Sequence, residues 1–207
     1  MRLYHGSKSG ISGPIRPMSR DHCDFGRGFY MGTDELQPLT LVCGYDAPHI
    51  YTLELDLSGL SVLHLQPNLD WALFVAYNRG KLEGARGSGL YERCAHLADG
   101  KDVVAGKIAN DRMFIVLDRF FDGFITDCAL VECLGALNIG DQYVAKTAVA
   151  CERVTIVDDR PISASEQEGY AELSEGNRRL GVSLAERICR ERRREGRFFD
   201  EILEEGI

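Results

Sequence analysis

The sequence predicts an α+β domain followed by a C-terminal helical appendage. Segments in which apolar and polar residues alternate, such as 51–57 (YTLELDL), are typical of half-buried strands, and they intermix with segments of helical periodicity. After Asp158 a polar link with one proline leads into sequence rich in Glu and Arg. We therefore expect one domain over residues 1–158, with helices flanking a sheet, and a helical extension over residues 159–207.

Composition and charge narrow the class of protein further. The chain has 207 residues, of which 44% are hydrophobic and 27% charged, as in a soluble globular protein. Its net charge of −8 argues against a protein that coats duplex nucleic acid. Its seven cysteines form no CxxC pair, which favours reduced thiols over disulfides or a zinc site. Because no apolar run is long enough for a signal peptide or a membrane span, we expect a cytoplasmic protein without membrane contact.

The first half of the chain is expected to alternate short strands with helices. Strands are predicted at 2–5, 29–32, 51–57 and 60–66. A helix is expected soon after the second strand, capped by Thr33 or Asp34. Asn68 is placed to cap another helix at 69–78, whose apolar residues recur at helical spacing. Residues 79–101 contain five glycines and several basic residues, which indicates an excursion or lid.

The second half is expected to complete the sheet before the chain becomes helical. A buried strand is predicted at 102–108, two short helices at 113–121 and 128–137, and closing strands at 142–149 and 153–158. Gly123 separates the two short helices, and Thr126 is the expected cap of the second. The extension is expected to hold two or three helices within residues 166–205. Its apolar side chains need burial against the domain itself or against a protein partner, and both alternatives stay open.

Two short motifs near the N-terminus carry most of the functional signal, LYHGS (3–7) and DFGRGFY (24–30). Each is weak alone, because a histidine at a strand end is more often structural than a ligand, and glycines around Arg27 are typical of a tight turn. Neither GxGxxG nor GxxxxGKS/T is present, so a phosphate-cradling loop is a poor explanation. The order and spacing of the two motifs, with His5 and Tyr30 lying 25 positions apart, is more informative.

Taken together, the motifs resemble the H-Y-E class of ADP-ribosyltransferases, which includes the diphtheria-toxin-like enzymes and the poly(ADP-ribose) polymerases. Gln142, in the segment DQYV (141–144), stands where that class has a glutamate. The chain is also similar to a bacterial family, domain of unknown function 3990, at both motifs, at Asn78-Arg79, at residues 109–112 and at the Gln142 strand. The resemblance covers about residues 2–157. It implies an ADP-ribosyltransferase-like split antiparallel β-sheet around an NAD cleft.

The resemblance implies that NAD is a substrate and that no metal is required. His5, Tyr30 and Gln142 would be the catalytic residues, with His5 hydrogen-bonded to the adenosine ribose and Tyr30 stacked on the nicotinamide ring. The backbone of Gly6 would clasp the nicotinamide amide. Arg27 would face the pyrophosphate unless it is simply an exposed arginine of the turn. The resemblance also places three more residues among those that bind the dinucleotide, namely Ser7, Phe25 and Gly28.

Three further residues are candidates for substrate contacts or a lid, namely Arg79, Asn110 and Asp111. Each has a structural alternative, since Asn110 or Asp111 can cap the next helix and Arg79 can end the previous one. The second stacking tyrosine of the polymerases falls near Leu41, which has no aromatic face. That role is therefore left unassigned.

Gln142 is the main departure from the pattern. A neutral amide still accepts a hydrogen bond from a ribose hydroxyl through its oxygen, but the bond is weaker by roughly 1–2 kcal/mol, or about tenfold in rate. Asp141 is not expected to replace the missing carboxylate, because adjacent strand residues point to opposite faces. The resemblance therefore implies single ADP-ribosyl transfer to a macromolecular acceptor, or NAD hydrolysis, rather than polymer synthesis.

Two other functions remain as alternatives. A catalytically inactive NAD- or ADP-ribose-binding module, whose helical tail recruits a partner, would bind the dinucleotide without releasing nicotinamide. RNA 2′-phosphotransfer is disfavoured by the acidic charge of the domain and by Tyr4 preceding His5. A role as a bacterial toxin or effector, including one half of a toxin–antitoxin pair, is an analogy from fold alone.

Overall fold

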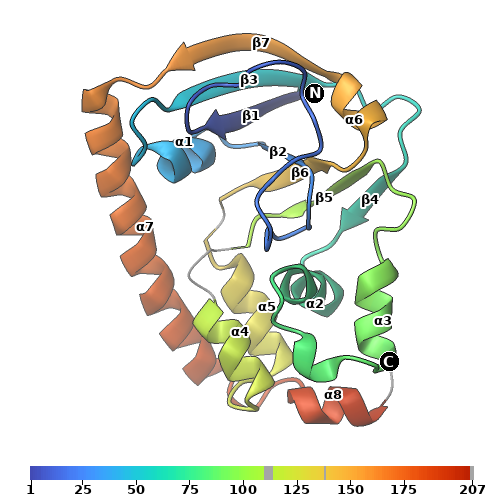
Figure 1. Ribbon diagram of the computed structural model, residues 1–207. Coiled ribbons are helices and arrows are strands. Elements are labelled where there is room, and N and C mark those ends of the chain that lie inside the picture. The colour runs from blue at the N-terminus through green and yellow to red at the C-terminus, as the bar shows by residue number, and fades with distance from the viewer. Residues whose placement is uncertain (110–113, 138, 206–207) are drawn as a thin grey trace.

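The computed structural model describes residues 1–109, 114–137 and 139–205. Within them the chain forms one mixed sheet of seven strands in the order β4-β5-β6-β2-β1-β3-β7, flanked by helices (Figure 1). The strands are β1 (Arg2–Ser7), β2 (Phe29–Gly32), β3 (His49–Leu55), β4 (Val62–Leu65), β5 (Val103–Lys107), β6 (Asp141–Ala145) and β7 (Val154–Pro161). The expected α+β class with flanking helices is confirmed.

The helices gather mainly beneath the β4-β5-β6-β2 half of the sheet (Figure 1). They are α1 (Leu36–Val42), α2 (Leu69–Asn78), α3 (Gly89–His96), α4 (Phe114–Phe121), α5 (Asp127–Gly135), α6 (Ala148–Glu152), α7 (Ala164–Glu191) and α8 (Phe199–Glu205). Asn68 and Thr126 cap α2 and α5 as expected, by accepting from the backbone N–H of Trp71 and of Ala129. Among the described helices, none combines the length and the apolar character needed to cross a membrane.

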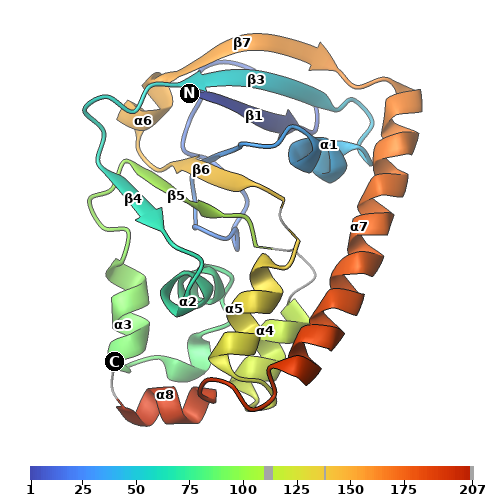
Figure 2. The same cartoon turned by 180° about the vertical axis from the view of Figure 1, so that it is seen from behind.

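The sheet is nearly divided between β1 and β2. These two strands share the single register pair Tyr4↔Gly32, whereas β1 pairs with β3 from Arg2 through Ser7. Two halves of the sheet therefore diverge from this junction (Figures 1 and 2). One consists of β1, β3 and β7, and the other of β2, β6, β5 and β4.

The expectation of a fully antiparallel sheet is wrong at one edge, where β4 and β5 are parallel. Every other pairing in the described residues is antiparallel. The physical reason is the connection between β4 and β5, which contains α2 and α3 and carries the chain back to the same end of the sheet. Parallel neighbours require a long crossover of this kind.

Three expectations about local structure need correction. The glycine-rich segment 79–101 is not an open excursion, because it holds a 3₁₀ turn (Glu83–Ala85) and α3, whose first turn is capped by Ser88. The strand expected to run to residue 149 ends at Ala145, and Thr147 caps α6 instead. The polar link after Asp158 is mostly ordered secondary structure, since β7 continues to Pro161 and a capping box of Ser163 and Glu166 starts α7.

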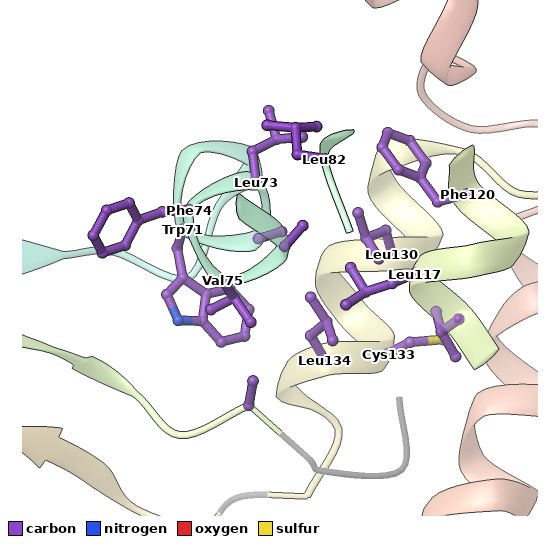
Figure 3. Close-up of a cluster of buried hydrophobic side chains, with 14 of the residues drawn as sticks. Trp71, Leu73, Phe74, Val75, Leu82, Leu117, Phe120, Leu130, Cys133 and Leu134 are labelled. Atoms are coloured by element: carbon purple, nitrogen blue, oxygen red, sulfur yellow. The ribbon is translucent and has the colours of Figure 1, made fainter. Parts of the chain in front are cut away.

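The main hydrophobic core lies between the sheet and helices α2, α4 and α5. Trp71 is fully buried at its centre, and its Nε1 donates to the carbonyl of Lys107 on β5 over 3.1 Å. Figure 3 shows Leu117 and Phe120 of α4 and Leu130 of α5 on one side of α2, with Phe74 pointing away from them. This core fixes the position of β5 and β6 relative to the helices.

The C-terminal extension completes the same core. Ala185 and Ile188 of α7, and Phe199 and Ile202 of α8, belong to the cluster that surrounds Trp71. The Phe199 ring lies 5.4 Å from that of Phe120, centroid to centroid. Helix α7 contacts α1 near its start and α5 near its end, so it runs along one side of the molecule (Figures 1 and 2). Of the two alternatives for these apolar residues, the domain itself covers the four named here.

We expect Phe199→Ala to lower the free energy of unfolding by about 3–5 kcal/mol, because it removes a ring from a closed aromatic cluster. The matched control is Phe198→Ala, since the neighbouring ring is 38% exposed and its removal costs less than about 1 kcal/mol. Chemical denaturation of the two variants measures the difference. Equal losses in both variants would contradict the assignment of α8 to the core.

Candidate functional site

A cleft of about 790 Å³ lies at the junction of β1 and β2. Its size is within the range of small-molecule sites. Residues of β1, β2, β6, α1, α7 and the loop before β2 line it. The three side chains predicted to be catalytic, His5, Tyr30 and Gln142, all line this cleft.

His5 presents one ring nitrogen with a defined hydrogen-bonding role. Its Nδ1 lies 2.7 Å from the carbonyl oxygen of Tyr30, and because a carbonyl only accepts, Nδ1 carries the proton. The ring stacks on Phe29 with centroids 4.4 Å apart. Burial lowers the pKa of His5, with the hydrogen bond to Tyr30 offsetting only part of the effect. The neutral ring therefore keeps Nε2 as a hydrogen-bond acceptor.

Tyr30 is a neutral aromatic residue whose hydroxyl is held by two hydrogen bonds. Its hydroxyl accepts from the backbone N–H of Phe25 over 3.0 Å and donates to the carbonyl of Gly26 over 2.7 Å. Burial raises the pKa of Tyr30, so the phenol stays protonated. The hydroxyl is thus already hydrogen-bonded within the loop, and Tyr30 lines the cleft while also packing against the main core.

Gln142 lies at the floor of the cleft beside a buried carboxylate. Its side chain is buried, and Nε2 donates to Asp24 Oδ2 over 3.0 Å and to the carbonyl of Lys107 over 3.5 Å. Asp24 Oδ1 accepts from Arg79 Nε over 2.6 Å, and the Arg79 and Asp24 side chains are 3% and 8% exposed. The backbone N–H of Ala109 also donates to Asp24 Oδ2, over 3.3 Å. Gln142 therefore belongs to a buried charged network.

Arg79 ends α2 as its C-cap, which is the structural alternative given for it, and its side chain is buried against Asp24 instead of reaching solvent. The residue also lines the cleft, so a contact with substrate stays a prediction. Asp24 is the first residue of the DFGRGFY motif, and no role was predicted for it. Only its place in that motif could have pointed to it, because the sequence does not show that Arg79 approaches it. Asn110 and Asp111 lie outside the described residues.

Gly6 lines the cleft and is also required by packing. A Cβ at this position would lie 2.8 Å from the carbonyl oxygen of Pro38 and 2.9 Å from Val42 Cγ1, so α1 leaves no room for a side chain. Gly28 has a packing role as well, since a Cβ there would lie 2.4 Å from Val144 Cγ1 on β6. The structure does not bring Gly28 into the cleft lining.

Three other predicted binding residues also lie outside the lining. Phe25 is fully buried in the main core, where its ring lies 6.0 Å from that of Phe74. Ser7 donates from Oγ to the carbonyl of Gly10 over 2.9 Å. Arg27 is the exposed arginine of the turn, with a side chain 74% exposed and paired with Asp21 at 2.9 Å. Phe25 and Arg27 belong to the loop that holds the Tyr30 hydroxyl, and Ser7 bonds to Gly10 near the start of that loop.

Asp141 does not substitute for a carboxylate at position 142. Its side chain forms an ion pair with Lys107 at 3.1 Å and does not line the cleft. Its backbone N–H and carbonyl both bond to Thr33. The residue therefore serves the edge of β6, on the face opposite to Gln142. Among the described residues, no three His, Cys, Asp or Glu side chains gather as metal ligands.

Sequence reasoning missed the wall that α7 contributes. Leu173, Ser174, Asn177 and Arg178 line the cleft, although nothing in their Glu- and Arg-rich surroundings distinguishes them from solvent-facing residues. Tyr45, just beyond α1, also lines the cleft, with the Lys8 ammonium 4.5 Å from its ring centre. Tyr45 lies beyond the end of α1, in a segment that is not helical, so the role of a second stacking tyrosine stays unassigned.

Comparison with known proteins identifies the N-terminal part of the chain. Residues 1–155 of the 207 match a family model described as "Protein of unknown function (DUF3990)". No curated protein and no solved structure matches the chain. The matched part includes the three strands that carry His5, Tyr30 and Gln142, whereas α7 and α8 lie beyond it.

We expect the imidazole of His5 to titrate below the usual histidine pKa of about 6.5, because burial penalises its charged form. The unfolded chain then binds the proton more readily, so the stability due to neutral His5 is lost as the pH falls below about 6.5. Side-chain NMR titration measures the ring directly. Exposed His96 is the internal control, because its hydrogen bond to Asp99 raises its pKa. A His5 that titrates with or above His96 would contradict this account.

Proposed function

The chain belongs to the DUF3990 family, and we propose that it is a mono-ADP-ribosyltransferase that uses NAD to modify a macromolecular acceptor. The observation that supports this most strongly is that His5, Tyr30 and Gln142, far apart in sequence, line one cleft. A histidine acceptor, an aromatic ring and an amide oxygen suit the ribose hydroxyls and the planar nicotinamide ring of a dinucleotide. The resemblance of the LYHGS and DFGRGFY motifs to the H-Y-E class supports the same assignment.

In this proposal three parts of NAD have a partner in the cleft. Tyr30 stacks on the nicotinamide ring, a contact worth about 0.5–1.5 kcal/mol beyond the area it buries. The neutral His5 accepts a hydrogen bond from the adenosine ribose at Nε2. The backbone of Gly6 holds the nicotinamide amide, at a position where α1 admits no side chain.

The proposed reaction breaks one bond and forms one. The bond between C1′ of the ribose and the nicotinamide nitrogen breaks, and its electron pair leaves with neutral nicotinamide. The acceptor then forms a bond to the cationic C1′ and loses a proton to solvent. Gln142 accepts a hydrogen bond from a hydroxyl of that ribose, which stabilises the developing positive charge. A neutral acceptor is weaker than a carboxylate by about tenfold in rate, which fits single transfer better than polymer synthesis.

The charge of the cleft supports an anionic ligand. Within the described residues, cationic side chains outnumber carboxylates in its lining, which includes Lys8, Arg20, Arg79, Arg178, Asp24 and Asp34. The chain as a whole carries a net charge of −8. A locally positive cleft in an acidic protein concentrates an anion such as a diphosphate.

A catalytically inactive NAD- or ADP-ribose-binding module is the second candidate function. The neutral side chain at position 142 is the observation that favours it, since the cleft then binds the dinucleotide without a strong group for the cationic sugar. Nicotinamide release separates the two. Binding of NAD without release, in the presence of cell lysate as a source of acceptors, would favour the inactive module.

The direct test is nicotinamide release from NAD by the wild-type protein, followed by chromatography. We expect measurable release, and Tyr30→Ala to lower kcat/KM by at least about tenfold, because it removes the stacking face. Tyr30→Phe keeps that face and should lose less than Tyr30→Ala. The proposal fails if the wild-type protein releases no more nicotinamide than buffer does.

Arg178→Ala tests whether α7 contributes to ligand binding. We expect its affinity for ADP-ribose to fall at least about tenfold, because a hydrogen bond to a charged group contributes about 1.5–3 kcal/mol. The exposed ion pair of Arg178 with Glu175 is weak enough for an anionic ligand to displace. Calorimetry against Arg179→Ala supplies the matched control, since exposed Arg179 is the next residue and does not line the cleft. Equal affinities in the two variants would exclude Arg178 from the site.

A further inference from the structure

We propose that Asp24 is a positioning residue that turns the Gln142 amide so that Oε1, and not Nε2, is presented to the cleft. The inference rests on the proposed function and adds to it a residue that the H-Y-E pattern does not include. Three contacts carry it: those of Asp24 with Gln142, with Arg79 and with the backbone of Ala109.

The polarity of the hydrogen bonds around Asp24 allows only one arrangement. The guanidinium of Arg79 and the backbone N–H of Ala109 can only donate, so both oxygens of Asp24 serve as acceptors. The side-chain atom of Gln142 that meets Asp24 must therefore be the donor Nε2, at 3.0 Å. The carbonyl of Lys107, 3.5 Å from the same nitrogen, is a second acceptor on that side.

The opposite orientation of the amide is strongly disfavoured. Turning the amide would place Oε1 against the oxygen of Asp24 and would leave a buried carboxylate with one donor fewer. The three side chains that the structure describes in this network are buried, so water replaces the lost bond less well than the amide does. The amide oxygen is consequently the group left to meet a ligand in the cleft.

This arrangement explains why position 142 holds glutamine. A glutamate there would place a second carboxylate at hydrogen-bond distance from Asp24, and one of the two would have to hold a proton. With glutamine, the negative charge resides on Asp24, behind the amide. A carboxylate that accepts from Nε2 polarises the amide and makes Oε1 a better acceptor. Asp24 and Gln142 together thus replace the single glutamate of the related pattern.

The Asp24→Asn substitution keeps the shape of the side chain but replaces one of its two acceptor oxygens with a donor NH₂ group. The Oδ1 of the new side chain faces Arg79, so its NH₂ group faces Gln142, whose amide then turns and presents Nε2. The same NH₂ group faces the backbone N–H of Ala109, which loses its acceptor. A donor cannot accept the hydroxyl proton of the ribose. We expect kcat for nicotinamide release to fall at least about tenfold, with a smaller change in KM for NAD.

The double variant Asp24→Asn with Gln142→Glu should restore part of the activity. The asparagine NH₂ then donates to the glutamate carboxylate, which supplies an acceptor to the cleft and keeps one carboxylate beside Arg79 among the described residues of the network. We expect kcat to rise at least about fivefold above that of Asp24→Asn, and the lost hydrogen bond from Ala109 keeps the recovery from being complete. Gln142→Glu alone leaves two adjacent carboxylates that share a proton, so its release rate should change with pH as that proton is lost, and the double variant should lack this dependence.

Asp21→Asn is the matched control, because Asp21 lies in the same loop, is exposed and lies outside the cleft lining. We expect its release rate to stay within about twofold of wild type. Thermal unfolding of each variant reports whether it is folded. A folded Asp24→Asn variant with wild-type kcat, or a double variant no more active than Asp24→Asn, would overturn the inference.

Two further comparisons keep the test decisive. If Asp24→Asn does not fold, Gln142→Glu and the double variant are compared across pH, and identical profiles would overturn the positioning role. If the wild-type protein binds ADP-ribose but releases no nicotinamide, the proposed transfer fails. Weaker ADP-ribose binding by Asp24→Asn, with recovery in the double variant, still supports the positioning role in that case, and unchanged binding overturns it.

Discussion

A buried ion pair between Arg79 and Asp24 ties together the segments that build the cleft. Arg79 follows α2, Asp24 lies in the loop before β2, and the same carboxylate accepts from Gln142 of β6 and from the backbone of Ala109 after β5. Charges at this depth persist only with their partners in place, because removing one leaves an uncompensated buried charge. The loop, the end of α2 and the floor of the cleft are therefore held in one arrangement.

The cleft depends equally on the near-division of the sheet. The strands β1 and β2 meet at a single register pair, and residues of both line the cleft. Helix α7 runs from α1 to α5 and forms one wall of the cleft. The boundary expected after residue 158 falls within β7. The extension beyond it contains α7, whose residues line the cleft together with strands of the first part.

Much of the fold could be predicted from the sequence, since alternation and caps are local signals. Asn68 and Thr126 cap the helices expected of them, and the strand at 29–32 has the predicted bounds. The parallel pairing of β4 and β5 could not be predicted, because it depends on how the intervening helices pack. The same holds for Asp24 and Arg178, whose places in the cleft follow from contacts between segments far apart in the chain. His5, Tyr30 and Gln142 were identifiable only because short motifs marked them.

A crystal structure of the protein soaked with NAD tests the central claim most directly. The account predicts that the dinucleotide occupies the cleft, with its nicotinamide ring on Tyr30 and a hydroxyl of the adjoining ribose about 2.5–3.0 Å from Oε1 of Gln142. An NAD molecule bound elsewhere, or a cleft that stays empty at a saturating concentration of NAD, would contradict it.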